Sequence, residues 1–379
     1  MKKSLIALAA LAATASFAQS SVQIDGLVDA GFQSNKYQGV SANGFDQNGA
    51  GTTQINFRGT EDLGGGLKAN FRLENDFSVV NNNANQGVVS AYAGTANTNT
   101  GALTTAATAN AGVNSKFGNG ELRVGLSGNF GAVNFGAINN GGLDFQATVA
   151  PVQGTSFAGG YGVITGADPS MSVVRWSNSA QYTTPTFSGF NASYIKANKQ
   201  TNANPANANF NDAIGRYNIL GADELTVRYN NGPLAAIAVF QQTDATGIST
   251  GTKKKMNSLG ANYTFGAVKV SAGYQTNKAD DNSMDRKAFT LGGFYTMGAT
   301  TLFAQYGENK ENAAASAYNG QKTKMSAVGV DYALSKMTKL YARYEDVKDN
   351  AGILTMASLN GNDASRNRTR TALGVQYKF

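Results

Sequence analysis

The sequence predicts an all-β fold: an antiparallel transmembrane β-barrel of about 16 strands, with a long third loop folded into the lumen. Three observations support this prediction. The chain begins with an export signal, it ends on an amphipathic strand, and alternating segments recur at a regular spacing between these ends. This combination is typical of bacterial barrels that cross the outer membrane with strands.

The amino-terminal segment has the three parts of a secretory signal. Residues 1–3 carry two lysines, residues 4–15 are apolar and rich in Leu and Ala, and residues 16–18 place small side chains at the positions that a signal peptidase reads. An apolar run of roughly a dozen residues is too short to span a bilayer as a helix, which takes about 20. We therefore predict a signal peptide over residues 1–18 and a mature barrel domain over residues 19–379 that begins at Gln19.

The carboxy-terminal segment has the pattern of the last strand of a barrel. Between residues 369 and 379 the polarity alternates, which places one set of side chains on a single face: Thr371, Leu373, Val375, Tyr377 and Phe379. Because this strand presents an aromatic face and a free carboxylate together, we expect Phe379 to be part of the signal read by the barrel assembly machinery.

Composition excludes several other classes. The chain has 379 residues with a mean hydropathy of -0.28, and after the signal no window has the apolar length of a membrane helix. A barrel remains compatible, because only every second residue of each strand meets lipid. The formal net charge of +7 includes two lysines of the signal, so the mature surplus is small. Nucleic-acid binding would require a concentrated basic face, and we expect none.

The absence of His and Cys argues against an enzyme. Without them the chain cannot build a Ser-His-Asp triad, a Cys-His pair, or a zinc or haem site based on these ligands. A carboxylate dyad is the remaining alternative, with candidates in Asp25, Asp29, Glu74 and Asp76. Paired acids on a channel lining more often act through electrostatics alone, so we expect no catalysis, no metal and no cofactor.

The body of the chain divides into alternating strands, short turns and longer polar connections. Short turns mark the periplasmic end of such barrels and long loops the outer end, so an even strand count places both termini in the periplasm. The predicted strands cover residues 22–33, 53–61, 67–77, 121–127, 131–138, 172–183, 190–196, 224–230, 234–242, 255–265, 268–276, 286–296, 301–307, 322–334, 339–346 and 368–379.

Three of the longer connections differ in character. Residues 34–52 have the composition of a long polar external loop. Residues 78–115 contain no charged side chain, and we leave open a flexible external tip or a segment that covers a neighbouring subunit. Residues 139–171 are Gly-rich, and their only charges are Asp144 and Asp168. A loop folded into the barrel is the favoured interpretation of the last segment, because a wide barrel otherwise has nothing to set its bore.

Several segments resemble the general diffusion porins of Gram-negative, especially β-proteobacterial, outer membranes. They are the start at 20–31, the run at 57–69, the Gly-rich hairpin at 123–131, the segment at 175–182 followed by Pro185, the segment at 332–336, and the final Phe379. The resemblance extends over the whole chain. Two departures are the sequence Gly136-Ala137-Ile138 where the family usually has Gly-Arg, and the lack of a clear acidic-Phe-Gly signature in the third loop.

The resemblance implies a homotrimeric outer-membrane channel for passive diffusion of ions and small hydrophilic solutes. It implies a pore narrowed by the third loop, with basic side chains on the opposing wall. Contact with outer-membrane lipid and lipopolysaccharide, and delivery by the barrel assembly machinery, come with the same family. The alternatives are a substrate-specific channel for a sugar or organic anion, and a structural or adhesive barrel; few aromatic residues fall on the predicted lumen face, which disfavours a sugar channel.

Strand parity locates the predicted selectivity residues. In strand 67–77 the apolar residues share one face, which directs Lys68 and Arg72 into the lumen. Arg58 and Arg123 follow the same parity in the neighbouring strands. We expect these four and Arg175 to line the constriction opposite an inserted loop that carries Asp144 and Asp168. The narrowest section is then net positive, which predicts weak anion selectivity.

Overall fold

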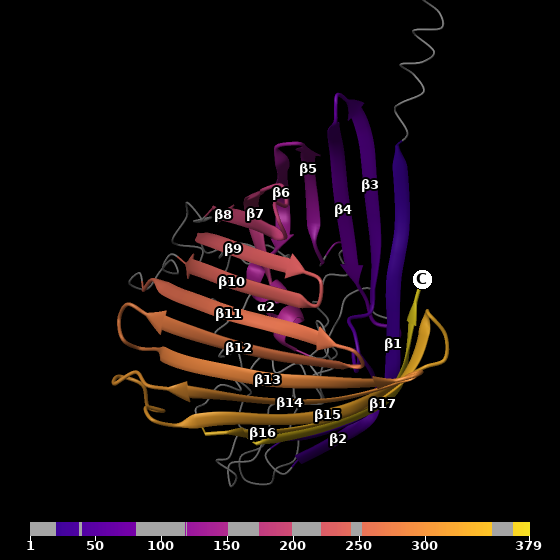
Figure 1. Ribbon diagram of the computed structural model, residues 1–379. Helices are drawn as coiled ribbons and strands as arrows, with labels where there is room; N and C mark the ends of the chain where they lie inside the picture. The colour runs from indigo at the N-terminus through magenta and orange to yellow at the C-terminus, as the bar shows by residue number, and fades with distance from the viewer. Residues whose placement is uncertain are drawn as a thin grey trace, which may run out of the picture.

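The computed structural model describes residues 20–37, 40–80, 118, 120–150, 174–198, 221–243, 252–350 and 367–379. In this part of the chain a single antiparallel sheet closes on itself around one helix, α2 (Gly141–Val149) (Figure 1). The strands are β1 (Ser21–Tyr37), β2 (Val40–Gln47), β3 (Gln54–Gly64), β4 (Leu67–Asp76), β5 (Leu122–Gly128), β6 (Gly131–Asn139), β7 (Arg175–Thr183), β8 (Phe190–Ala197), β9 (Ala222–Asn231), β10 (Leu234–Thr243), β11 (Lys254–Phe265), β12 (Val268–Ala279), β13 (Asp285–Met297), β14 (Thr300–Glu311), β15 (Lys322–Ala333), β16 (Thr338–Asp349) and β17 (Arg368–Lys378).

The predicted fold class is confirmed, with one correction at the start of the barrel. All 16 predicted segments overlap a strand, but the described chain has 17 strands because residues 40–47 form β2. β3 pairs with residues 21–27 of β1 and β2 pairs with residues 30–37, both on the same edge of that strand. Together β2 and β3 therefore occupy one strand position of a closed 16-stranded barrel. The prediction of a long external loop over 34–52 is therefore wrong. Pairing with β1, including edge contact of Phe32 with Phe45, imposes a strand on a segment of weak intrinsic propensity.

Strict alternation of side chains separates the two faces of the wall. Along β11, for example, Met256 and Ser258 are buried while Leu259 and Tyr263 are exposed. Most exposed large hydrophobic side chains of the described strands share the outward parity, as expected for a surface that meets lipid. Among the described residues, no helix is long and apolar enough to cross a membrane.

The barrel closes between the first and last strands. β1 pairs with β17 over residues 27–37 and 368–378. Beyond this ladder, the Gly26 amide donates to the Phe379 carbonyl at 3.0 Å, and the Phe379 amide donates back to the Gly26 carbonyl at 3.1 Å. Gly26 has no room for a side chain, since a Cβ would lie 2.4 Å from the Phe379 ring. The last residue of the chain therefore completes the hydrogen-bonded seam.

The two ends of the barrel differ in the length of their connections. At one end tight turns join consecutive strands, with Gly232, Gly266 and Gly298 at positive φ. Left-handed φ angles are typical of two-residue hairpin turns. At the other end the connections are longer, such as residues 280–284, 312–321 and 350–367. By the usual orientation of such barrels, the short-turn end faces the periplasm and the long-connection end faces outward.

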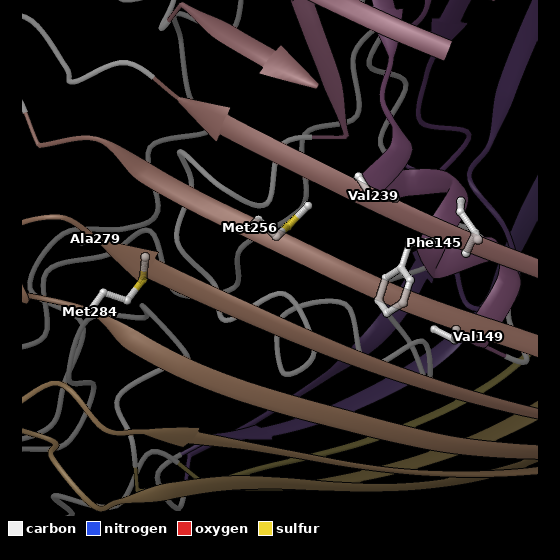
Figure 2. Close-up of a cluster of buried hydrophobic side chains, with 7 residues drawn as sticks. Phe145, Val149, Val239, Met256, Ala279 and Met284 are labelled. Carbon is white, nitrogen blue, oxygen red and sulfur yellow. The ribbon is translucent and has the colours of Figure 1, made fainter. Parts of the chain in front are cut away.

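Helix α2 packs on the inner face of the wall, as Figure 1 shows for its position within the curved sheet. Phe145 and Val149 point from the helix toward β11 and β12 (Figure 2), where Gly260 and Gly273 leave space for the two side chains. A Cβ on Gly260 would lie 2.5 Å from Val149. The glycines thus let the helix approach the strand backbones closely. The predicted signal peptide, the segment 81–115 and Asp168 lie outside the described residues.

Candidate pore constriction

Three arginines form a single row across neighbouring strands. Arg58 of β3 is the direct register partner of Arg72 of β4, and Arg72 is the partner of Arg123 of β5. Directly opposed residues in an antiparallel sheet have Cβ atoms only about 5 Å apart and point to the same face. The structure therefore brings together the three arginines that parity directs to the lumen.

Such a row of like charges is unfavourable unless anionic groups accompany it. Arg72 donates to Glu74 at 2.5 Å and to Glu121 at 2.8 Å. Glu121 lies 3.6 Å from Arg123, and Glu74 lies 3.6 Å from Arg175. The acids are the more deeply buried members, because the side chains of Glu74 and Glu121 are 6% and 8% exposed against 19% for Arg72. The guanidinium groups of Arg72 and Arg123 thus stand in front of these two carboxylates, toward the lumen. Arg58 differs, because its partner Asp25, at 3.1 Å, is 38% exposed against 45% for the arginine.

Asparagine side chains hold the same guanidinium groups in place. The Asn56 carbonyl oxygen accepts from Arg72 Nη2 at 3.1 Å, and those of Asn70 and Asn134 accept from Arg123 Nη1 at 2.6 and 2.8 Å. Hydrogen bonds of this kind restrict the rotamers of the long side chains. The arginine wall is therefore fixed before any solute arrives.

Helix α2 supplies the facing side of the constriction. Its N-cap is Asn140, whose side-chain oxygen accepts from the Leu143 amide at 3.1 Å. Asp144 in the first turn forms an ion pair with Arg228 of β9, and Arg228 Nε donates to the same carboxylate at 3.0 Å. A carboxylate in the first helical turn is also stabilised by the helix dipole.

A buried carboxylate ties the start of α2 to the wall. Glu224 of β9 is only 1% exposed and accepts a hydrogen bond of 2.5 Å from the Gly141 amide. Trp176 Nε1 donates to the other carboxylate oxygen at 3.0 Å, and Gln241 Nε2 donates to it at 2.8 Å. Glu224 therefore links β7, β10 and the amino terminus of the helix in one polar cluster.

At its other end, α2 is held through backbone carbonyl groups. The Thr148 carbonyl accepts from Asn262 at 2.9 Å, and the Val149 carbonyl accepts from Ser271 at 2.8 Å. These carbonyls belong to the last turn of the helix, where no partner exists within the helix itself. Both ends of the helix are thus bonded to inward-facing side chains of the barrel.

The space between α2 and the wall forms two cavities. One, of about 680 Å³, extends from Arg72 and Arg175 across to β13–β17, and the other, of about 550 Å³, lies against β4–β9. Both are lined by Arg72, Asn139 and Asp144. These shared residues mark where the helix and the arginine wall face each other. The lining of the two cavities carries seven basic and five acidic side chains: Arg72, Arg123, Arg175, Arg228, Lys339, Arg343 and Lys378, with Glu74, Asp76, Glu121, Asp144 and Asp331.

The far wall carries a second basic group with aromatic neighbours. Arg343 of β16 forms an ion pair with Asp331, and its guanidinium lies 4.6 Å from the Phe303 ring centroid and 5.3 Å from that of Tyr341. Phe294 packs against Phe303. The expectation that few aromatics face the lumen therefore needs correction on β13, β14 and β16. Phe294 packs against Phe303, and the Arg343 guanidinium lies over the rings of Phe303 and Tyr341, at the short-turn end.

A second carboxylate holds an inward-folded connection near this wall. Asp29 is fully buried and accepts hydrogen bonds from the amides of Gly49 and Ala50 at 2.9 and 3.0 Å. Tyr341 Oη donates to the same side chain at 2.8 Å. The segment between β2 and β3 is thereby drawn into the barrel, where Ala50 and Gly51 line the larger cavity.

The predicted site residues divide into two groups. Five lie on the inner wall or on α2: Arg58, Arg72, Arg123, Arg175 and Asp144. Lys68 has the same parity but is exposed and lies four residues closer to the short turn than Arg72, which is about 13 Å along the strand at the usual rise. Asp168 lies outside the described residues.

Sequence reasoning missed several residues of the site. Arg228, Glu121 and Arg343 were not singled out, although Arg228 and Arg343 alternate with apolar residues in the manner of Arg72. Parity could have identified these two. Glu121 lies just before β5, and only the fold brings it to Arg72.

Comparisons with known proteins agree with this geometry. A model of the Gram-negative porin family matches residues 5–352. Outer membrane porin protein 32 of Delftia acidovorans is 36% identical over 299 residues, which cover 73% of this chain and 70% of that protein. An outer membrane porin protein of Bordetella pertussis is 29% identical over 307 residues, with 72% and 69% covered. Among solved structures, the anion-selective porin from Comamonas acidovorans superposes with a TM-score of 0.72 at 25% identity, covering 95% of this chain and all of that one (100%).

A closed barrel whose lumen is lined by charged side chains and narrowed by an inner helix defines a channel-forming protein of the outer membrane. The family match specifies the class further. The chain belongs to the Gram-negative porin family and forms a channel for passive diffusion across the outer membrane.

Proposed function

We propose that this porin conducts ions and small hydrophilic solutes with a weak preference for anions. The observation that carries the proposal is the in-register row of Arg58, Arg72 and Arg123, in which Arg72 and Arg123 stand in front of the more deeply buried Glu74 and Glu121. The solved structure of an anion-selective porin, with its TM-score of 0.72, supports the same assignment.

The preference for anions is weak because the positive and negative charges of the cavity lining nearly cancel. Seven basic side chains line the cavities against five acidic ones, so the net positive charge is small for so polar a lining. The position of the charges matters more than their sum, because exposed guanidinium groups lie closer to a passing ion than the carboxylates behind them. In a narrow, partly desolvated passage salt screens these electrostatic interactions poorly, so the closer guanidinium groups have the larger effect on the ion.

The guanidinium donors also give the passage its chemical character. Small polar solutes that lose part of their hydration beside Arg72 and Arg123 can exchange water for N–H donors. Apolar solutes gain no such compensation. We assign no catalysis to the carboxylates, since each of Asp25, Glu74 and Glu121 is within ion-pair distance of an arginine. We likewise propose that the channel needs no cofactor or metal.

Zero-current potentials in a potassium chloride gradient test the proposal. Replacing Arg58, Arg72 and Arg123 together by Gln removes three positive charges from the wall and should move the potential toward cation preference, with little loss of conductance. The matched control is K287Q/K310Q/K324Q, which removes three positive charges from the outer surface of the barrel. An unmodified channel that prefers potassium, or a potential that both variants leave unchanged, contradicts the assignment.

A substrate-specific channel is the second candidate, and the aromatic rings beside Arg343 are the observation in its favour. Phe294 and Phe303 line the larger cavity together with Lys339 and Arg343, which would suit a carboxylate attached to an apolar body. Single-channel conductance separates the candidates. A current proportional to salt that no organic anion saturates supports general diffusion, whereas saturable block by one solute supports the specific channel. Absence of current would indicate a structural barrel.

We further propose a homotrimer as the functional assembly, since a related structure is described as a trimer form. Outer-membrane lipid and lipopolysaccharide would surround this assembly, and the barrel assembly machinery would insert it. Unheated samples on a denaturing gel should migrate as a trimer that heating converts to the monomer. A single unheated band at monomer mass would overturn the proposed assembly.

A further inference from the structure

A short inward bulge interrupts the strand position next to β1. Pairing of β2 with β1 ends at Gln47, opposite Ala30, and pairing of β3 begins at Gln54, opposite Leu27. Between these two points the six residues 48–53 oppose only two residues of β1, so four of them are extra. Extra residues on one strand leave the hydrogen-bonded ladder and bend that strand locally. We call residues 48–53 the inner bulge.

The base of the inner bulge is closed by side-chain hydrogen bonds. Asn48 has a φ of 63°, a left-handed conformation that asparagine adopts more readily than most residues, and its side-chain oxygen accepts from the Thr53 amide at 2.9 Å. The Thr53 hydroxyl accepts from the Asp29 amide at 3.0 Å and donates to the Asp29 carbonyl at 3.1 Å. Thr53 therefore satisfies the edge of β1 at the point where the regular ladder is interrupted.

The tip of the inner bulge is held on the inner wall by the Asp29 carboxylate. Besides the amides of Gly49 and Ala50, this carboxylate accepts from the Gln376 side-chain amide at 3.3 Å and from the Tyr341 hydroxyl at 2.8 Å. The last two donors belong to β17 and β16, so one fully buried side chain of β1 joins the bulge to three neighbouring strands. Removal of the carboxylate would leave the tip without these two backbone hydrogen bonds.

Two glycines allow the inner bulge to lie directly against the wall. A Cβ on Gly49 would lie 2.4 Å from the Tyr341 hydroxyl oxygen, and a Cβ on Gly51 would lie 3.2 Å from the side chain of Leu27. Glycine permits this close approach of one backbone to its neighbours. The bulge thus packs on the wall as a layer of backbone and does not extend freely into the lumen.

The inner bulge and α2 face each other across the same cavity. In the closed sheet β10 lies half-way around the barrel from β1, and α2 packs on β10–β12. The cavity of about 680 Å³ is lined by Ala50 and Thr52 of the bulge and by Leu143 and Ala147 of the helix. The lumen is thus narrowed from two opposed sides, and the bulge reduces it by about 5 Å, the width of one extended backbone layer.

We infer that the inner bulge is a second restriction of the pore, which limits the size of the solutes that pass. Residues 48–53 carry no charged side chain, so this restriction acts through its volume and leaves the ion preference unchanged. Asp29 is its positioning residue, since the buried carboxylate contacts the bulge and not the solute. The inference rests on the channel function of the barrel and is independent of the proposed anion preference.

Deletion of residues 48–51 tests the inference. Thr52 and Thr53 then oppose the two residues of β1, and because an even number of residues is removed, all other side chains of the strand keep their faces. The single-channel conductance of the full mature protein should rise about 1.5-fold, since a layer about 5 Å thick leaves one side of the lumen. In liposome swelling, the rate for neutral raffinose relative to that for neutral arabinose should rise at least about twofold.

A matched control removes four residues from the outside of the barrel. Residues 314–317 lie in the connection between β14 and β15, at the long-connection end, and line neither of the two cavities. Their deletion should leave the conductance and the sugar ratio unchanged, and both deletions should keep the zero-current potential of the unmodified channel. A folded 48–51 deletion with unmodified conductance and sugar ratio, an equal rise in the control, or a shifted zero-current potential would overturn the inference. Failure of the anion assignment would instead appear in R58Q/R72Q/R123Q.

Single-cysteine variants test the same inference without a deletion, because the chain has no native cysteine. Thr52→Cys places a thiol on the bulge where it lines the larger cavity, and a bulky neutral maleimide attached there should lower the single-channel current stepwise. Ala317→Cys, exposed in the connection between β14 and β15, should react without changing the current. Complete modification of Thr52→Cys with no change of current would contradict the restriction.

The positioning role of Asp29 has its own measurement, the rate of thiol modification. Ala50 is only 7% exposed, so Ala50→Cys should react slowly. Adding Asp29→Ala removes two hydrogen bonds to the bulge, each worth about tenfold in the local opening equilibrium, and should accelerate the reaction about a hundredfold. Glu61→Ala, exposed on β3, is the control and should leave the rate unchanged. Heat-modifiability on a gel verifies folding of every variant, and equal rates with and without the Asp29 carboxylate would overturn its role.

Discussion

The anchoring of α2 by Glu224 leads to a prediction about the constriction. The Glu224 carboxylate meets the amino terminus of the helix through the Gly141 amide at 2.5 Å. Its other contacts, from Trp176, Thr226 and Gln241, come from the barrel wall and persist whether or not the helix is docked. Replacing Glu224 by Ala should therefore weaken the docking of α2 without unfolding the barrel.

The magnitude follows from the two interactions that Glu224 makes with the helix, the hydrogen bond to the Gly141 amide and the attraction to the helix dipole. A hydrogen bond to a charged group contributes about 1.5 to 3 kcal/mol, and a carboxylate at a helix amino terminus adds about 0.3 to 1 kcal/mol. Together they favour the docked helix by roughly 3 kcal/mol, which corresponds to about a hundredfold in the ratio of docked to undocked helix. Glu224→Gln keeps a carbonyl that can accept from Gly141 and loses the charge, so about half of this free energy and roughly tenfold should disappear.

Hydrogen exchange monitored by mass spectrometry at pH 8 measures this ratio directly, in a peptide that covers residues 139–150. Local opening governs exchange of such amides, so the rate should rise about a hundredfold in Glu224→Ala and about tenfold in Glu224→Gln. Glu308→Ala, on the outer surface, is the control and should leave the peptide unchanged. Exchange in Glu224→Ala at the rate of the unmodified protein, or equally fast exchange in the Gln and Ala variants, would refute the proposed anchoring.

Three further predictions concern packing, assembly and processing. Gly260→Val should displace α2, because a Cβ at this position would lie 2.5 Å from Val149 and 2.9 Å from the Phe145 ring. The expected result is an altered single-channel conductance at a normal yield of trimer. Deleting Phe379 removes both closing hydrogen bonds to Gly26 and should lower outer-membrane yield while pores that do form conduct normally; unchanged heat-modifiable trimer contradicts this. The mature amino terminus should be Gln19, and any other residue found by mass spectrometry contradicts the predicted cleavage.

The strands could be predicted because each carries its own signal. In any strand that separates lipid from water, side chains that face the lipid must alternate with side chains that face the aqueous lumen. The parity of Leu67 to Leu73 therefore places Arg72 inward, and the outward parity of Tyr295 and Tyr344 is visible in the same way. The sequence of β2 carries too weak a strand signal to be predicted, since its Gly and Asn residues have low strand propensity and become extended only by pairing with β1.

The constriction was predictable only in part. Parity locates the arginines but cannot reveal that Glu74 and Glu121 stand behind them, because that depends on contacts between β4 and the start of β5. The sequence predicts an inserted loop but no helix at α2, whose N-cap Asn140 and anchor Glu224 belong to segments 84 residues apart in sequence. The aromatic group at Arg343 likewise needs the pairing of β14, β15 and β16.

By itself, the sequence determined the class of fold, the two faces of the 16 predicted strands and some of the charged residues that line the lumen, because the bilayer imposes a local, two-residue period on each membrane-spanning strand. Only the tertiary structure decided which lining charges meet across strands, how α2 is held against the wall, and that residues 48–53 fold inward between β2 and β3. Those features depend on strand register and barrel closure, which bring distant segments together and leave no periodic trace in the chain.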